Sequence, residues 1–200
     1  MPIIGSLAAG SARGLGGLRT FGASAVDDGA MFPLSLITVG GAGASFIEFT
    51  NIPTTYAHLQ LRAISRSASS FHHSYIRVGN GSVDTGSNYS SHILVGSGAS
   101  AASENYTSAT ATYLESMPAQ NGASIFSAMT IDFLDYANTN KHKTIRTMSG
   151  GDTNGSGYLF FLSGRWGSTS AINTIRFINN NSTNIQEHST FALYGIKGAA

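Results

Sequence analysis

Hydrophobic and polar residues alternate with a period of two along most of the chain after residue 45, in short runs separated by turn residues. In one such run, Leu59 and Leu61 fall on one side of an extended strand, and Gln60 and Arg62 fall on the other. Runs of this kind, rich in β-branched and aromatic residues and bounded by Gly, Asn, Ser or Asp, are typical of half-buried β-strands. No window of about 12 residues holds an uninterrupted 3.6-residue period. The pattern therefore predicts strands and no long helix.

Ten runs with this character predict roughly ten strands. They cover residues 45–50, 57–65, 75–79, 91–96, 110–115, 125–136, 143–150, 158–166, 172–179 and 190–196. The runs do not recur at a fixed period, so a propeller or a solenoid is not expected. A jelly-roll-like antiparallel β-sandwich accommodates this number of strands, loops of irregular length and a closing C-terminal strand. We therefore expect an all-β, jelly-roll-like sandwich over residues 45–200.

Residues 1–44 form a separate zone in which glycine-rich stretches flank the apolar piece 31–39. That piece is compatible with a first strand or with a docking segment. Ordering about 25 residues costs tens of kcal/mol of backbone entropy, and the apolar residues near the N-terminus are too sparse to form a core of their own. We therefore predict an extended arm for assembly or anchoring over residues 1–44. Its expected contact residues are apolar or basic: Ile3, Ile4, Leu7, Arg13, Leu15, Leu18, Arg19 and Phe21.

Charged residues make up only 10% of the chain, against about 25% in an average domain. A surface built from Ser, Thr, Asn and Gly carries few charges to keep copies apart, which favours a protein that lives in an assembly. The net charge of +1 gives no global field toward nucleic acid or an anionic membrane, so neither partner is expected. The sequence has no cysteine, which excludes disulfides and thiolate metal sites.

Two kinds of candidate ligand site have ordinary structural explanations. The glycine clusters 14–17 and 40–43 lack the Lys and Ser/Thr of a phosphate-binding loop. The adjacent His72 and His73 would point to opposite faces of a strand, so they do not converge on one ion. We therefore expect neither a cofactor nor a functional metal site.

The segment 152–157 places Asp152, Asn154 and Ser156 at alternate positions before Gly157, as in a calcium-binding loop. However, Ser163 stands where such a loop supplies its bidentate Glu, and the segment lies between two predicted strands. A hairpin turn is therefore the preferred interpretation.

Catalytic patterns are weak. Asp132 and Asp135 are three residues apart on a predicted strand, so their carboxylates face opposite sides and do not form an acid–base pair. No G-x-S-x-G motif is present, and we expect a protein that is not an enzyme. Trp166 and the tyrosines more often fill a sandwich core or a subunit interface than form a sugar-binding platform. The alternative hypothesis is a carbohydrate-binding module that uses Trp166, Asp152 and Asn154.

Four stretches in order resemble a family of tailed-bacteriophage virion structural proteins. The first, 45–67 (SFIEFTNIPTTYAHLQLRAISRS), resembles an I-x-F strand followed by an IPxTYxHLxL turn and strand. The second, YIRVGNGSVDTGSNYSSHIL, resembles a strand that leads through N-G to a GxNYS turn. The third, GRWGSTSAINTIRF, resembles LWxSTxAITxIxF, with Gly164 and Arg165 replacing the commoner apolar lead-in. The fourth, 189–198 (STFALYGIKG), resembles the closing FxLYGI strand, with Glu187 and His188 where a Gly often precedes the Ser.

This resemblance covers about residues 45–198 and implies a jelly-roll-like sandwich that decorates a capsid or forms part of a tail or fibre. It implies other virion proteins as partners, assembly in the host cytoplasm and location in the virion. It also implies a homo-oligomer, for which a trimer is expected. It supplies no catalytic residues.

Overall fold

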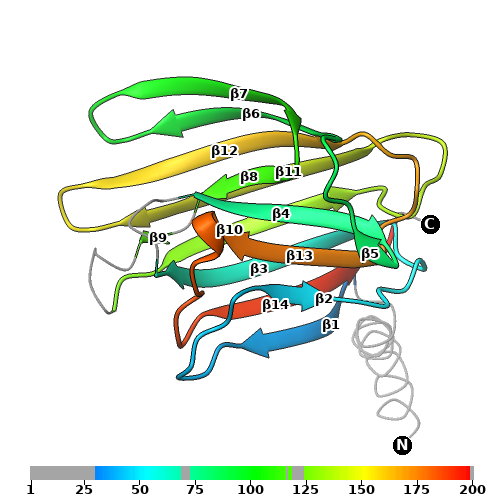
Figure 1. The fold of residues 1–200 in the computed structure, drawn as a ribbon, viewed down its shortest axis with the longest axis horizontal. Helices are drawn as coiled ribbons and strands as arrows, with labels where there is room; N and C mark the ends of the chain where they lie inside the picture. Colours follow the sequence, from blue (N-terminus) through cyan, green and yellow to red (C-terminus); the bar gives the residue numbers. More distant parts are fainter. Residues whose placement is uncertain (1–29, 69–72, 116, 119–123, 199–200) are drawn as a thin grey trace, which may run out of the picture.

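The structure is a computed structural model that describes residues 30–68, 73–115, 117–118 and 124–198. Nearly every element in these ranges is a strand (Figure 1). In chain order they are β1 (Met31–Thr38), β2 (Ile47–Phe49), β3 (His58–Ser67), β4 (His73–Asn80), β5 (Ser82–Val83), β6 (Tyr89–Gly96), β7 (Ala101–Ala109), β8 (Thr112–Glu115), β9 (Met117–Pro118), β10 (Ser127–Leu134), β11 (Lys143–Asp152), β12 (Gly157–Trp166), β13 (Thr174–Asn179), the short 3-10 helix η2 (Asn180–Ser182) and β14 (Thr190–Ile196).

Eight of the strands pair like the two arms of one long antiparallel hairpin. β1 pairs with β14, β2 with β13, β3 with β10, and β4 with β8. The first and third pairs lie in one sheet, in the order β1-β14-β3-β10, and the second and fourth lie in the other sheet. A hairpin rolled up in this way is a jelly roll. The predicted all-β sandwich is therefore confirmed.

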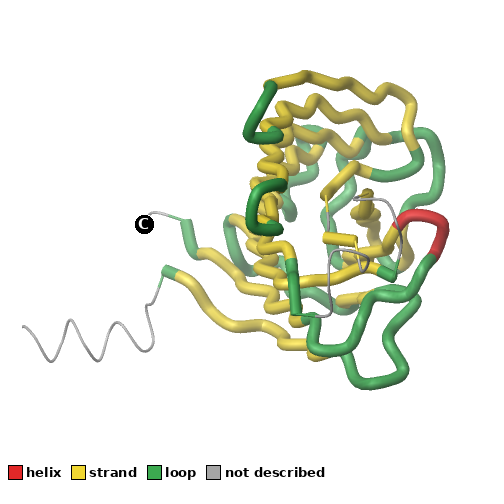
Figure 2. Tube along the Cα trace, turned by 90° about the vertical axis from the view of Figure 1, so that its left-hand side faces the viewer, coloured by secondary structure: helices red, strands yellow, loops and turns green. Residues whose placement is uncertain are grey.

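Two inserted hairpins widen the larger sheet. The β11–β12 and β6–β7 hairpins continue it beyond β10, which gives the order β1-β14-β3-β10-β11-β12-β6-β7. The turns of both hairpins lie at the same end of the sheet, on the left in Figure 1. Figure 2, turned by 90°, shows the two sheets as separate layers with the small sheet on one side of the large one.

The core lies between the two sheets and follows the period of two along each strand. Leu59 and Leu61 of β3, and Ile131 of β10, point into it and are buried. The rings of Phe177 on β13 and Phe191 on β14 lie 4.9 Å apart between centroids and join the small sheet to the large one. Each such side chain contributes about 1.5–3 kcal/mol through removal from water.

Residues 31–38 correct the expected domain boundary. They form β1, an edge strand of the large sheet that pairs with β14 over its whole length apart from an irregularity between Pro33 and Ser35. Of the two interpretations left open for this piece, the structure shows the strand, and the sandwich begins near residue 31 rather than at 45. The expected arm contacts, from Ile3 to Phe21, all lie outside the described residues.

Candidate functional site

The face of the large sheet turned away from the small sheet, here called the outer face, carries a group of exposed hydrophobic side chains. They are 49–69% exposed and come from five strands: Leu36 on β1, Ile64 on β3, Leu94 on β6, Met148 on β11, and Leu159 and Phe161 on β12. We call these six residues the apolar zone. Met148, Phe161 and Leu94 are direct cross-strand neighbours, so the zone is continuous over β11, β12 and β6.

The sequence of β12 shows why both of its faces are apolar. Phe160 and Leu162 point inward and are buried, while Leu159 and Phe161 alternate with them and point outward. A strand with hydrophobic residues on both faces is typical of sheets that are covered on both sides. In this chain the small sheet covers only the inner face. The outer face of β12 therefore carries hydrophobic side chains that no layer of the described residues covers.

A shallow trough of about 930 Å³ lies beside three residues of the apolar zone, Ile64, Met148 and Leu159. Its floor is made by small residues that pair across the sheet: Ala128 on β10, Gly150 on β11 and, beyond Leu159, Gly96 on β6. Ile64 stands on one side of this floor and Leu159 on the other. The turns of both inserted hairpins line one end of the trough, through residues 97–98, 152 and 155–157. The outer face is thus recessed where its side chains are small.

Polar residues border the apolar zone on the same face. The Asp132 carboxylate on β10 accepts hydrogen bonds from Gln60 Nε2 and from Arg146 Nη2, each at 2.8 Å. Arg62 Nε in turn donates to Gln60 Oε1 at 2.8 Å. The Asp132 carboxylate therefore has a hydrogen-bond donor on each neighbouring strand, Gln60 on β3 and Arg146 on β11.

The loop 152–157 is the hairpin turn that the sequence favoured. Thr153 N–H donates to the Ser156 carbonyl at 2.8 Å, and Asn154 N–H donates to Asp152 Oδ1 at 2.7 Å. Asn154 and Gly155 have positive φ angles of 56° and 112°, which suit Asn and Gly. The Asp152 carboxylate thus stabilises its own turn at the rim of the trough. Among the described residues, no three His, Cys, Asp or Glu side chains are grouped so that they could hold a metal ion.

Trp166, the proposed sugar-stacking residue, belongs to the core. It is 3% exposed, and its indole Nε1 donates to Asp84 Oδ2 at 2.7 Å. Its ring therefore offers no open face to a sugar, and it lies at the opposite end of β12 from the 152–157 turn. Asp84 also accepts hydrogen bonds from Asn88 Nδ2 and Gly86 N–H, both at 2.8 Å. Burial acts to raise the pKa of Asp84, but these three hydrogen bonds outweigh it and hold the pKa below its ordinary value.

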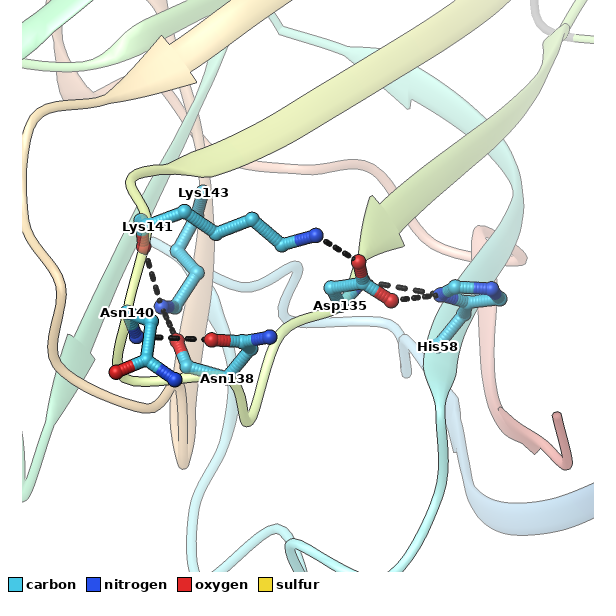
Figure 3. Close-up of polar contacts among 6 residues, drawn as sticks. All are labelled: His58, Asp135, Asn138, Asn140, Lys141 and Lys143. Atoms are coloured by element: carbon cyan, nitrogen blue, oxygen red, sulfur yellow. Dashed lines mark hydrogen bonds and ion pairs between the residues drawn. The ribbon is translucent and has the colours of Figure 1, made fainter.

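A cluster of polar and titratable groups lies at the turn between β10 and β11 (Figure 3). Asp135 N–H donates to His58 Nδ1 at 2.9 Å, and the Asp135 carboxylate receives a short hydrogen bond from Lys141 Nζ. The hydrogen bond from Lys141 lowers the pKa of Asp135 below its usual value. These contacts fix the turn where β10 ends.

Lys143 completes the cluster from inside the sandwich. It is 1% exposed, and its ammonium donates to the carbonyl oxygens of Asn138, of Lys141 at 3.1 Å and of Thr169 at 3.0 Å. All three ammonium protons thus have acceptors. Burial lowers the pKa of Lys143, and the nearby Lys141 charge adds to the effect. With its protons engaged in this way, Lys143 holds two loops together.

The two aspartates of the predicted β10 segment take separate roles. Asp132 faces the outer surface and pairs with Arg146, whereas Asp135 lies beyond the strand and contacts His58 and Lys141. The expectation that both lie on one strand is thus wrong for Asp135, because β10 ends at Leu134.

The comparisons with known proteins add no relative. No protein-family model matches the chain, and no curated protein sequence matches it. Within the described ranges, no helix has the length and apolar character needed to cross a membrane.

Proposed function

We propose that this chain is a non-enzymatic structural subunit of a bacteriophage virion, a capsid decoration protein or a component of the tail or fibre. The observation that carries the proposal is the apolar zone on the outer face. Contiguous exposed apolar patches mark protein interaction sites on soluble domains. Here the patch lies on a regular sheet, whose backbone hydrogen bonds hold its side chains in fixed positions.

The magnitude of the apolar zone supports a binding role. Full burial of a Leu, Ile, Met or Phe side chain contributes about 1.5–3 kcal/mol, so covering six half-exposed ones contributes about 5–9 kcal/mol on one partner alone. A partner with a similar surface roughly doubles this value. The hydrophobic free energy from both partners is comparable to the free-energy cost of association, about 4–15 kcal/mol. Polar contacts at the border add to it.

The virion setting rests on the resemblance of residues 45–198 to the phage family, together with the low charge of the chain. The jelly roll supports this setting as a fold that many capsid proteins use. The proposed partners are other virion proteins and further copies of the chain, with a trimer as the expected oligomer. In this proposal the chain acts through surface contacts, with the arm at residues 1–29 as a second attachment.

The proposal is tested by incorporation into particles. We expect tagged wild-type protein to copurify with phage particles through density-gradient centrifugation, in a fixed ratio to the major capsid or tail protein. A variant lacking residues 2–29, which precede β1, should fold, as judged by circular dichroism, and should be lost from the particles. A wild-type protein that is absent from purified particles would refute the virion role. Unchanged incorporation of the truncated variant would refute the role of the arm.

A further inference from the structure

We propose that the occupant of the apolar zone is a second copy of this chain, which packs its own outer face against the first. This inference rests on the proposed function, because it names the partner that covers the site described above. Three properties of the outer face favour a copy over an unrelated partner: its size, its shape and its charge.

The outer face is large enough for a stable contact. Eight strands about 4.8 Å apart span about 34 Å, and strands of 7–10 residues at about 3.3 Å per residue span about 23–33 Å. The face therefore offers about 1,000 Å² in plan. A standard protein–protein interface buries about 800 Å² on each partner. Five residues of the apolar zone, on β3, β11, β12 and β6, would lie inside such an interface, and Leu36 on the edge strand β1 and the Asp132 border would lie toward its rim.

The outer face carries both projections and a recess. Leu36, the most exposed of the six residues, projects near one edge of the sheet. The trough, with its floor of Ala128 and Gly150, lies on the central strands of the same face. In a symmetric contact each copy presents the same patch, so a face that holds both a projection and a recess can complement itself. The same reasoning applies to a closed ring, in which each copy uses the projection of one neighbour and the recess of the other.

Charge does not oppose self-contact. The net charge of the whole chain is +1, so two copies repel each other weakly. At the border, Asp132 is neutralised by Arg146 within each copy, with Nη2 and Oδ2 at 2.8 Å. Burial of this border therefore leaves the Asp132 carboxylate paired, while Asp152 at the rim of the trough keeps the hydrogen bond from Asn154 N–H.

Gly96 provides a precise probe of this contact. It lies on β6 beside Leu159, within the trough, and a Cβ atom built there has no heavy atom within 4 Å. Gly96→Glu therefore places a charge in the trough without a clash inside the subunit. Gly40→Glu is the matched control, because Gly40 is equally free of neighbours but does not line the trough. Leu159→Ser is a second probe, because it shortens an exposed side chain of the zone.

The test is the mass of the purified full chain in solution, measured by sedimentation equilibrium from about 1 to about 100 µM. We expect wild type and Gly40→Glu to reach the mass of a dimer or trimer of the 20.8 kDa chain. Gly96→Glu should weaken association about a hundredfold or more, since its carboxylate would be buried without a partner. Leu159→Ser should weaken association in the same direction, by a smaller factor. Thermal unfolding of each variant establishes that it is folded.

A wild-type monomer at about 100 µM would overturn the proposal, and so would Gly96→Glu and Leu159→Ser variants that associate like wild type. Particle incorporation separates this failure from failure of the proposed function. If the wild type is monomeric but Gly96→Glu alone is lost from particles, the zone binds another virion protein, and the second copy is refuted while the virion role stands. If glycan arrays instead bind wild type and not Gly96→Glu, the trough binds carbohydrate and the proposal is likewise overturned.

Discussion

Replacement of Lys143 by Met should destabilise the sandwich, although the new side chain fills nearly the same buried volume. The ammonium is the common donor to three backbone carbonyls, those of Asn138 and Lys141 in the β10–β11 turn and that of Thr169 in the loop between β12 and β13. Met retains the apolar contacts of the stem but donates no hydrogen bond. The variant therefore tests whether this ammonium joins the two loops.

The magnitude follows from the number of acceptors that lose their donor. A hydrogen bond from a charged group contributes about 1.5–3 kcal/mol, so three give about 4.5–9 kcal/mol before desolvation. Burial of the ammonium opposes this gain, in agreement with the lowered pKa of Lys143. Water also reaches some of the freed carbonyls in these surface loops. We expect a net loss of about 3 kcal/mol, which corresponds to a fall in melting temperature of about 6–12 °C for a domain of this size.

Urea unfolding monitored by circular dichroism measures this loss, with the slope against denaturant as a check that the unfolded state is unchanged. Lys141→Met is the matched control, since its side chain is 55% exposed and its pair with Asp135 lies at the surface. Such a pair contributes at most about 1 kcal/mol. A Lys143→Met variant within about 1 kcal/mol of wild type, or no less stable than Lys141→Met, would refute the reasoning.

Three further changes probe other parts of the fold. Thr147 is buried and its hydroxyl has no hydrogen-bond partner among the described residues. Thr147→Val should therefore raise the free energy of unfolding, measured by urea denaturation, by about 1 kcal/mol. A lower free energy of unfolding would contradict this. The pKa of Asp84 is lowered in the folded state, so the stability it contributes is present above about pH 4 and is lost as pH falls through the folded pKa. Asp84→Asn should therefore have a lower free energy of unfolding than wild type at pH 7, and this difference should shrink toward pH 2. A difference that stays constant with pH would contradict a carboxylate stabilised by the hydrogen bonds from Trp166, Asn88 and Gly86. In Gly195→Ala the added Cβ would lie 2.5 Å from the Tyr56 ring. The free energy of unfolding should therefore fall by about 1–3 kcal/mol, as measured by thermal unfolding. An unchanged melting temperature would show instead that the ring moves aside freely.

The strands that cover a core were predictable from the sequence, and those that cover nothing were not. Each of the ten predicted runs overlaps a strand of the structure, because one face of each strand is buried and imposes the period of two. β7 was missed. Its residues, AASENYTSA, are nearly all exposed on both faces, so burial imposes no alternation on them. β1 was left undecided because its apolar residues form a run rather than an alternation.

The candidate site was harder to predict, because a single sequence does not tell which side of a strand is covered. In the run that contains Phe160 and Phe161, either set of alternate residues could have formed the core. The pairing of β12 with β11 and β6 determines which set faces the core, and the β12–β6 pairing joins residues far apart in the chain. Burial of Trp166 was the preferred expectation, because aromatic residues on alternating strands usually fill a core, and the structure confirms it. The hairpin turn at Asp152 was predictable, because its Asn and Gly occupy the positive-φ positions of a local turn.

A density map of the intact phage particle tests the central claim most directly. The jelly roll should be found on the particle with its outer face against another protein chain, so that Ile64, Met148 and Leu159 are covered. A map that places this subunit with the apolar zone open to solvent would contradict the account. So would a complete map of the particle without this subunit.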